Sequence, residues 1–167
     1  MKINVFRNFF FIAGICLLSS IGFGQTTFKN QYLKTLNDIA NSSFSSVLKL
    51  MKERKYILDD KGVDSNDGGV YFVFTGKVDQ ELMVSYSKSK ELVFIAQDLL
   101  TLNLVFCEME LQDKGFTKLS ATKEKEDGIN ITITKWGKSG YPYRYVLHQS
   151  EDKVSQLTLQ SKISSGY

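Results

Sequence analysis

The chain has 167 residues, of which 43% are hydrophobic, so it is long enough for one domain with a real core. It carries 21 basic and 18 acidic side chains, but two of the basic ones, Lys2 and Arg7, lie in an N-terminal stretch that we expect to be removed. The 19 basic and 18 acidic residues that remain are nearly balanced. This balance argues against nucleic acid as a partner, because such binding needs a strongly basic surface.

Residues 1–24 have the pattern of a secretory signal peptide. The positive charges of Lys2 and Arg7 precede the apolar run 9–18, and small residues follow it. We therefore expect residues 25–167 to be exported to the periplasm or the cell exterior, as with signal peptides of the Gram-negative type, with no stable membrane span left after cleavage. An uncleaved anchor is the alternative, although the apolar run is short for a membrane-spanning helix.

Loss of this leader would remove Cys16 and leave Cys107 as the single cysteine. No intramolecular disulfide is then possible, so the fold must be held by packing. Cys107 lies in an apolar stretch, between Phe106 and Met109, which favours a buried and unreactive thiol over a nucleophile.

The first predicted element of the exported chain is a helix over residues 28–54. Apolar residues recur there at three- and four-residue steps, the spacing of one helical face. They are Leu33, Leu36, Ile39, Ala40, Phe44, Val47, Leu48 and Met51. The polar run Asn41-Ser42-Ser43 is expected to bend this helix or to divide it in two.

Residues 59–69, DDKGVDSNDGG, lie between two predicted strands, 56–58 and 70–75, and pose a choice between a calcium site and a turn. A calcium loop that begins at Asp64 would require a glutamate at its twelfth position, where this chain has Thr75. Asp, Asn and Gly are also the residues that form tight turns. We favour a solvated connection without a metal.

The predicted strands 82–87 and 92–97 flank a polar turn, and a second helix is expected to follow over residues 99–114. Asp98 is a plausible N-cap for this helix and Gly115 a plausible end. The alternative is a strand over residues 99–111, in which apolar residues also alternate. The remaining predicted strands are 116–122, 129–136, 143–148 and 154–160.

This order of elements repeats itself. Tyr56 and Phe116 open corresponding strands, and Gly69 and Gly128 precede the strands that follow. We predict an α+β fold of two tandem α-ββββ units, at about 28–97 and 98–161, whose antiparallel sheet is open or barrel-like and has the helices on one face. In outline this is similar to the tandem helix-plus-sheet architecture of the β-lactamase inhibitor proteins, a likeness of topology that transfers no site.

Two surfaces are candidates for binding a partner. In the strand 70–75, Tyr71 and Val73 oppose two phenylalanines, so both faces are apolar, and the second face is either covered or binds something. The segment KWGKSGYPYRY gathers further candidates, which are Trp136, Tyr141, Tyr143, Arg144 and Tyr145. Trp, Tyr and Arg dominate binding hot spots, but ordinary packing of a hairpin explains the same cluster.

The sequence contains no recognisable catalytic, cofactor-binding or metal-binding motif. His148 is the single histidine, and Arg144 shares its strand face. Glu108 and Glu110 are two apart on a predicted helix and do not share a face. We therefore expect no enzyme activity, no cofactor and no metal, and a pocket that unites His148 with acidic side chains would contradict this interpretation.

The expected function is that of an exported non-catalytic binding protein, which engages a protein or peptide through a sheet face or the aromatic segment. A first alternative is a carrier of a small apolar ligand, held in a cavity between sheet and helices near Phe72, Phe74 and Phe94. A second is a hydrolase, which would need two carboxylates that converge in a cleft.

Overall fold

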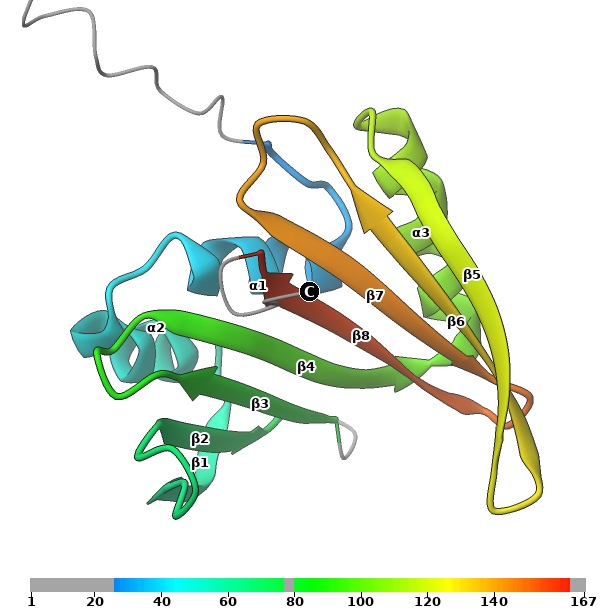
Figure 1. The fold of residues 1–167 in the computed structure, drawn as a ribbon. Coiled ribbons are helices and arrows are strands. Elements are labelled where there is room, and N and C mark those ends of the chain that lie inside the picture. Colours follow the sequence, from blue (N-terminus) through cyan, green and yellow to red (C-terminus); the bar gives the residue numbers. More distant parts are fainter. Residues whose placement is uncertain (1–25, 77–79, 163–167) are drawn as a thin grey trace, which may run out of the picture.

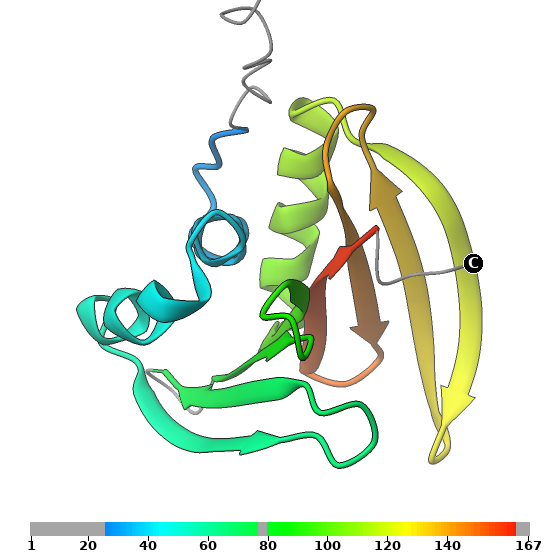
Figure 2. The same ribbon diagram turned by 60° about the vertical axis from the view of Figure 1, so that its left-hand side comes forward.

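A computed structural model describes residues 26–76 and 80–162 of the chain. The predicted α+β class is confirmed: eight strands form one antiparallel sheet, and the helices lie on one side of it (Figures 1 and 2). The elements are α1 (Gln31–Ala40), a 3-10 turn (Phe44–Ser46), α2 (Val47–Glu53), β1 (Ile57–Val63), β2 (Val70–Thr75), β3 (Glu81–Tyr86), β4 (Leu92–Leu100), α3 (Thr101–Asp113), β5 (Thr117–Glu126), β6 (Ile129–Gly137), β7 (Tyr143–Ser150) and β8 (Val154–Ser161).

The strand order is β1-β2-β3-β4-β8-β7-β6-β5. Each half of the chain supplies four consecutive antiparallel strands, and the halves join where β4 pairs with β8. That central pairing runs from Phe94 opposite Gln160 to Leu100 opposite Val154. β1 and β5 are left as the two edges of the sheet. Figure 2 shows how strongly the sheet curves between them.

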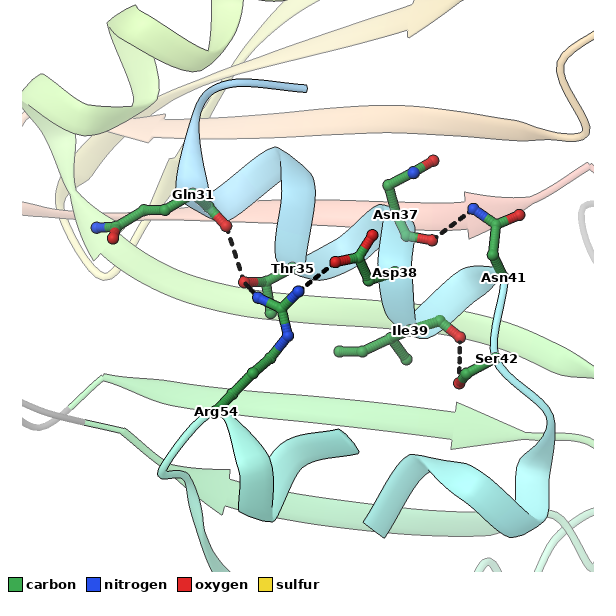
Figure 3. Close-up of polar contacts among 8 residues, drawn as sticks. All are labelled: Gln31, Thr35, Asn37, Asp38, Ile39, Asn41, Ser42 and Arg54. Carbon is green, nitrogen blue, oxygen red and sulfur yellow. Dashed lines mark hydrogen bonds and ion pairs between the residues drawn. The ribbon is translucent and has the colours of Figure 1, made fainter. Parts of the chain in front are cut away.

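The helix predicted over residues 28–54 is divided, as the polar run at 41–43 suggested. α1 ends at Ala40, and α2 begins only at Val47. Figure 3 shows how the break is held: Asn41 and Ser42 donate side-chain hydrogen bonds back to the carbonyl oxygens of Asn37 and Ile39. These bonds satisfy the last carbonyl groups of α1 and so end the helix.

Arg54, at the end of α2, fixes the angle between the two helices. Its guanidinium donates to Thr35 Oγ1 at 2.9 Å and forms an ion pair with Asp38, both on α1 (Figure 3). Thr35 Oγ1 in turn donates to the Gln31 carbonyl oxygen at 2.8 Å. One arginine therefore joins α2 to two turns of α1.

The prediction that Asp98 caps the second helix is wrong. β4 continues to Leu100, and α3 begins at Thr101 without a side-chain cap. Asp98 lies opposite Gln156 of β8, whose amide donates to Asp98 Oδ1 at 3.2 Å. Pairing with β8 satisfies the backbone of residues 98–100, and this long-range contact outweighs the local capping signal. The alternative of a strand over residues 99–111 is also wrong.

Gly115 follows the end of α3, as predicted, with a φ of 77° that glycine adopts without strain. Most predicted strand ends are correct within two residues. Three strands run more than two residues beyond their predicted ends: β1 runs to Val63 and not to residue 58, β4 to Leu100 and not to residue 97, and β5 to Glu126 and not to residue 122. The first five residues of the segment 59–69 therefore belong to β1.

The core lies between the helices and the sheet. Tyr145 of β7 is buried at its centre, and its ring is in edge contact with those of Phe28 and Phe116, at centroid distances of 5.8 and 5.4 Å. Cys107 is buried in the same layer, as predicted.

Within the described residues, no helix has the length and apolar character needed to cross a membrane.

A candidate binding groove on the open face of the sheet

The face of the sheet that points away from the helices is hollowed into a groove of about 500 Å³. Five neighbouring strands, from β4 through β8, β7 and β6 to β5, contribute to its lining. The lining residues are Phe94, Ala96, Ser120, Thr122, Glu124, Ile133, Lys135, Val146, His148, Gln156, Thr158 and Gln160.

Alternation along the strands places these side chains. In β7, Tyr145 and Leu147 are buried against the helices, so Val146 and His148 point to the opposite face. Strand pairing then places residues of the adjacent strands beside them: Ile133 of β6 lies opposite His148, and Thr158 of β8 lies opposite Val146. These four residues form the middle of the groove.

The groove combines an apolar floor with polar and charged walls. Its floor includes Val146, which is buried, and the half-buried Ile133 and Ala96. Serine, threonine and glutamine side chains supply hydrogen-bonding groups around it, and Glu124 and Lys135 add one charge of each sign on its exposed side. An apolar floor with a few oriented polar groups is the usual composition of a binding site.

His148 is half-buried in this groove, and burial is the main reason why its pKa lies below the ordinary value. Glu126 and Glu124 act in the opposite direction and raise this pKa, whereas Lys135 lowers it. Because burial prevails, the imidazole is neutral at neutral pH and offers one donor and one acceptor nitrogen.

His148 and one acidic side chain, Glu124, thus line the same groove, which is in part the pocket that would contradict the non-catalytic interpretation. Among the described residues, however, Glu124 is the one carboxylate in its lining, and no hydrogen bond joins a carboxylate to the imidazole.

The aromatic candidates from the segment 136–145 pack into the core in different degrees. Trp136 and Tyr145 are 2% and 0% exposed and point toward the helices, so their rings are out of reach of a partner. Tyr141 and Tyr143 are half-buried and donate hydrogen bonds to α1, the first to Asn37 Oδ1 at 2.8 Å and the second to the Ala40 carbonyl oxygen at 3.2 Å. These four side chains thus pack against the core and α1.

Arg144 is the member of this segment that faces the open side. It lies opposite Gln160 of β8, a residue of the groove lining, and is half-buried. Its position at the border of the groove was not evident from the sequence, because the pairing of β7 with β8 brings the two residues together.

Tyr71 and Val73 lie on the outer face of β2 and are half-buried. The Tyr71 ring crosses β1 so closely that a Cβ atom at Gly62 would come within 2.5 Å of its hydroxyl, which donates to Asp60 at 3.2 Å. The Tyr71 side chain therefore lies across the outer face of β1. β3 and β4 separate Tyr71 and Val73 from the middle of the groove, so the structure does not unite them with Arg144.

The turn between β1 and β2 accounts for two of the four aspartates of the segment 59–69, since Asp59 and Asp60 belong to β1. Asp64 Oδ1 accepts from the backbone N–H of Asn66 at 2.8 Å, and Asp67 Oδ1 accepts from that of Gly69 at 2.7 Å. These are the local hydrogen bonds for which Asp is favoured in turns. In the described part of the chain, no group of three or more His, Cys, Asp or Glu side chains is arranged to hold a metal ion.

Most of the groove was missed by sequence reasoning. The hydrophobic alternation of Ile129, Ile131 and Ile133 marked one face of β6, but not which face meets the helices. The contribution of β5 to the groove could not be predicted from the sequence either, because its ten residues are all exposed and follow no apolar pattern.

Comparisons of the chain with protein-family models, with curated proteins and with solved structures found no match.

Proposed function

We propose that the chain is an exported, non-catalytic binding protein that engages a protein or peptide partner in the groove on the open face of its sheet. The observation that carries this proposal is the groove itself, since five strands converge there on one hollow with an apolar floor and polar walls. Export is inferred from residues 1–24, which lie outside the described residues.

The dimensions and chemistry of the groove support a peptide segment as its occupant. A volume of about 500 Å³ accommodates several side chains, and the buried Val146 offers an apolar contact at the floor. Gln156, Thr158 and Gln160 follow one another at every second position of β8, so they form a row of hydrogen-bonding groups along the groove. Such a row suits the repeating polar groups of a peptide backbone.

A small amphipathic ligand is the second candidate for the same groove, because its volume lies within the ordinary range for small-molecule sites. The carrier hypothesis placed the ligand in a cavity between the sheet and the helices. Phe72 and Phe74 are buried there, however, and pack against each other at a centroid distance of 6.2 Å. Phe94 lies on the opposite face and lines the groove. A ligand is therefore better placed on the open face.

We also infer that the two halves of the chain are copies of one α-ββββ unit. The order of elements, with helix before four strands in each half, supports this inference. The sheet order supports it too, since each half runs inward from its first strand at an edge to its fourth strand at the centre. On this view the groove belongs to the second unit, with β4 as the contribution of the first.

The proposal is tested by blocking the groove. Thr158→Arg places a long side chain over its floor from a half-buried position, and Thr132→Arg is the matched control, because Thr132 lies on β6 outside the groove lining. Tagged wild-type and variant proteins are used to capture partners from the envelope fraction of the exporting cell, and each captured partner is then tested in purified form by calorimetry.

A partner that binds the wild type and Thr132→Arg but loses at least tenfold in affinity for Thr158→Arg supports the proposal. A partner that binds both variants equally places the interaction elsewhere and contradicts it. A small molecule that is released on denaturation from the wild type and from Thr132→Arg, but not from Thr158→Arg, would establish the second candidate instead.

A further inference from the structure

α3 carries two apolar faces, only one of which the fold uses. Leu104, Cys107 and Leu111 point into the core and are buried. On the other side Leu102, Val105, Phe106 and Met109 recur at the same three- and four-residue steps and are exposed. We call these four residues the α3 stripe. A helix that is apolar on both faces is normally covered on both faces.

The exposure of the α3 stripe is substantial. Leu102 is 66%, Phe106 52% and Met109 56% exposed. Taken together the four side chains present roughly 400 Å² of apolar surface, which is the size of patch that is often functional on a soluble protein. α3 lies at one end of the helical layer (Figure 1) and packs against β8, β4 and β7. No other described element covers the stripe.

We propose that the α3 stripe is the interface of a homodimer, in which α3 packs antiparallel against α3 of a second copy. A two-fold axis near Val105 and Phe106 would place Leu102 of each copy against Met109 of the other. Such an interface is closed and self-complementary, as in most homodimers.

The distribution of charge along α3 favours a second copy in this orientation. All three acidic residues, Glu108, Glu110 and Asp113, lie in the C-terminal half of the helix, whereas the first turn has no acidic residue and no side-chain cap. An antiparallel pair sets each acidic half against the N-terminal end of the other helix, where the dipole is positive. A parallel pair would bring like charges together.

Asp113 is the acidic residue best placed for this contact. Glu108 is already paired with Lys118, at 3.1 Å, and Glu110 accepts hydrogen bonds from the backbone N–H groups of Lys29 and Asn30. Asp152 also lies near the N-terminal end of α3, since its carbonyl oxygen accepts the hydrogen bond of Thr101 Oγ1. Asp152 is exposed, so solvent screens its carboxylate and it opposes the contact made by Asp113 only weakly.

The shape of the surface also favours self-association. Beside the C-terminal end of the stripe is a hollow of about 330 Å³, lined by Lys29, Phe106, Met109, Glu110, Asp113 and Lys114. The antiparallel arrangement directs Leu102 of the second copy, the most exposed residue of the stripe, toward this hollow. Each copy thus supplies both the projecting side chain and the hollow that receives it.

The dimer is expected to be weak. Two stripes bury roughly 800 Å² in total, below the range of stable interfaces, so association should depend on concentration and should appear above about 10 μM. Sedimentation velocity of residues 25–167, which contain every described helix and strand, is measured from about 1 μM to about 1 mM.

Phe106→Glu is expected to remain monomeric over this whole range with an unchanged circular dichroism spectrum, because Phe106 is half-exposed in the monomer. Leu119→Glu, at an exposed leucine outside α3, is the matched control and should dimerise like the wild type. A wild type that stays monomeric, or a Phe106→Glu variant that dimerises equally well, would overturn the proposal.

Cross-linking tests the orientation without relying on either charged variant. Leu102→Cys and Met109→Cys are each oxidised alone and then as a mixture, and the native Cys107 is buried and does not interfere. The antiparallel arrangement predicts a disulfide-linked dimer in the mixture and little cross-linking of either variant alone. Efficient cross-linking of Leu102→Cys to itself would contradict that arrangement.

Discussion

Glu110 caps the beginning of α1 from a helix 80 residues further along the chain. Its two carboxylate oxygens accept hydrogen bonds from the backbone N–H groups of Lys29, at 2.6 Å, and Asn30, at 2.7 Å. Asn30 Oδ1 then accepts from the N–H of Tyr32 at 2.9 Å, as an N-cap residue does. The first and third helices are joined through this chain of hydrogen bonds.

Glu110→Ala is therefore expected to lower the free energy of unfolding by about 1–2 kcal/mol, since it removes two hydrogen bonds from a charged acceptor. Urea unfolding followed by circular dichroism measures the change. Glu108→Ala is the control on the same helix, because the Glu108–Lys118 ion pair is partly exposed and should contribute less than about 1 kcal/mol. Equal losses for the two variants would show that the cap has no special role.

Gly69 occupies a position with no room for a larger residue. A Cβ atom there would come within 2.6 Å of the Tyr86 carbonyl oxygen, which belongs to the backbone of β3 and cannot move without disturbing the sheet. We expect Gly69→Ala to destabilise the protein by about 1–3 kcal/mol in urea unfolding. Asn66→Ala, at an exposed position of the same turn, should cost less than about 0.5 kcal/mol. A neutral Gly69→Ala would show that the turn adapts.

Calcium is expected to leave the melting temperature unchanged. The carboxylate oxygens Oδ1 of Asp64 and Asp67 already accept backbone hydrogen bonds within the β1–β2 turn. Ligand binding to the native state would raise the melting temperature. Differential scanning calorimetry in millimolar calcium, compared with millimolar magnesium and with chelator, provides the measurement, and an upward shift specific to calcium would contradict the interpretation of this turn.

Cys107 is expected to be inert in the native protein. Burial raises the pKa of its thiol to about 12, so the reactive thiolate is scarce at neutral pH, and the side chain is inaccessible. An aromatic disulfide reagent should therefore modify residues 25–167 only after denaturation, with one thiol per chain. Fast modification under native conditions would mean that α3 detaches readily from the core.

His148 should make the protein less stable in mild acid. Burial lowers its pKa in the folded state, so between pH 7 and pH 5.5 the unfolded chain takes up a proton more readily than the folded chain does. The stability that depends on the neutral imidazole is thus present above its ordinary pKa of about 6.5 and is lost as the pH falls below it. The stability curve of the wild type should fall over this interval.

His148→Gln tests the assignment, because His148 is the only histidine in the chain. The variant should show a flatter dependence of the unfolding free energy on pH between 7.5 and 5.5, measured in urea at each pH. A variant whose stability falls as steeply as that of the wild type would assign the effect to other groups.

Much of the secondary structure followed from local patterns. The alternation of aromatic and β-branched residues placed β2 correctly, and the polar run at 41–43 marked the break between α1 and α2. Asp98 shows where local reasoning failed, since a good capping residue was drawn into β4 by pairing with Gln156. Two of the three strands that were predicted too short, β1 and β5, are the edges of the sheet, whose exposed polar residues carry little periodic signal.

The candidate site was hardly predictable. Trp136 and Tyr145 were plausible as a binding edge because their chemistry suits interfaces, but the same apolar area drives them into the core. The sequence analysis considered His148 by itself and did not consider Glu124. The two residues meet in one groove because β5, β6 and β7 are consecutive neighbours in the sheet.

The sequence by itself determined the fold class, the burial of Cys107 and the positions of most strands, because these depend on the spacing of apolar residues along a short stretch of chain. Only the tertiary structure decided which face of each strand meets the helices and which strands lie side by side. Both are set by contacts between residues far apart in the chain, such as Phe94 with Gln160, and no local pattern specifies such a partner. The groove and the exposed stripe of α3 are consequences of those contacts.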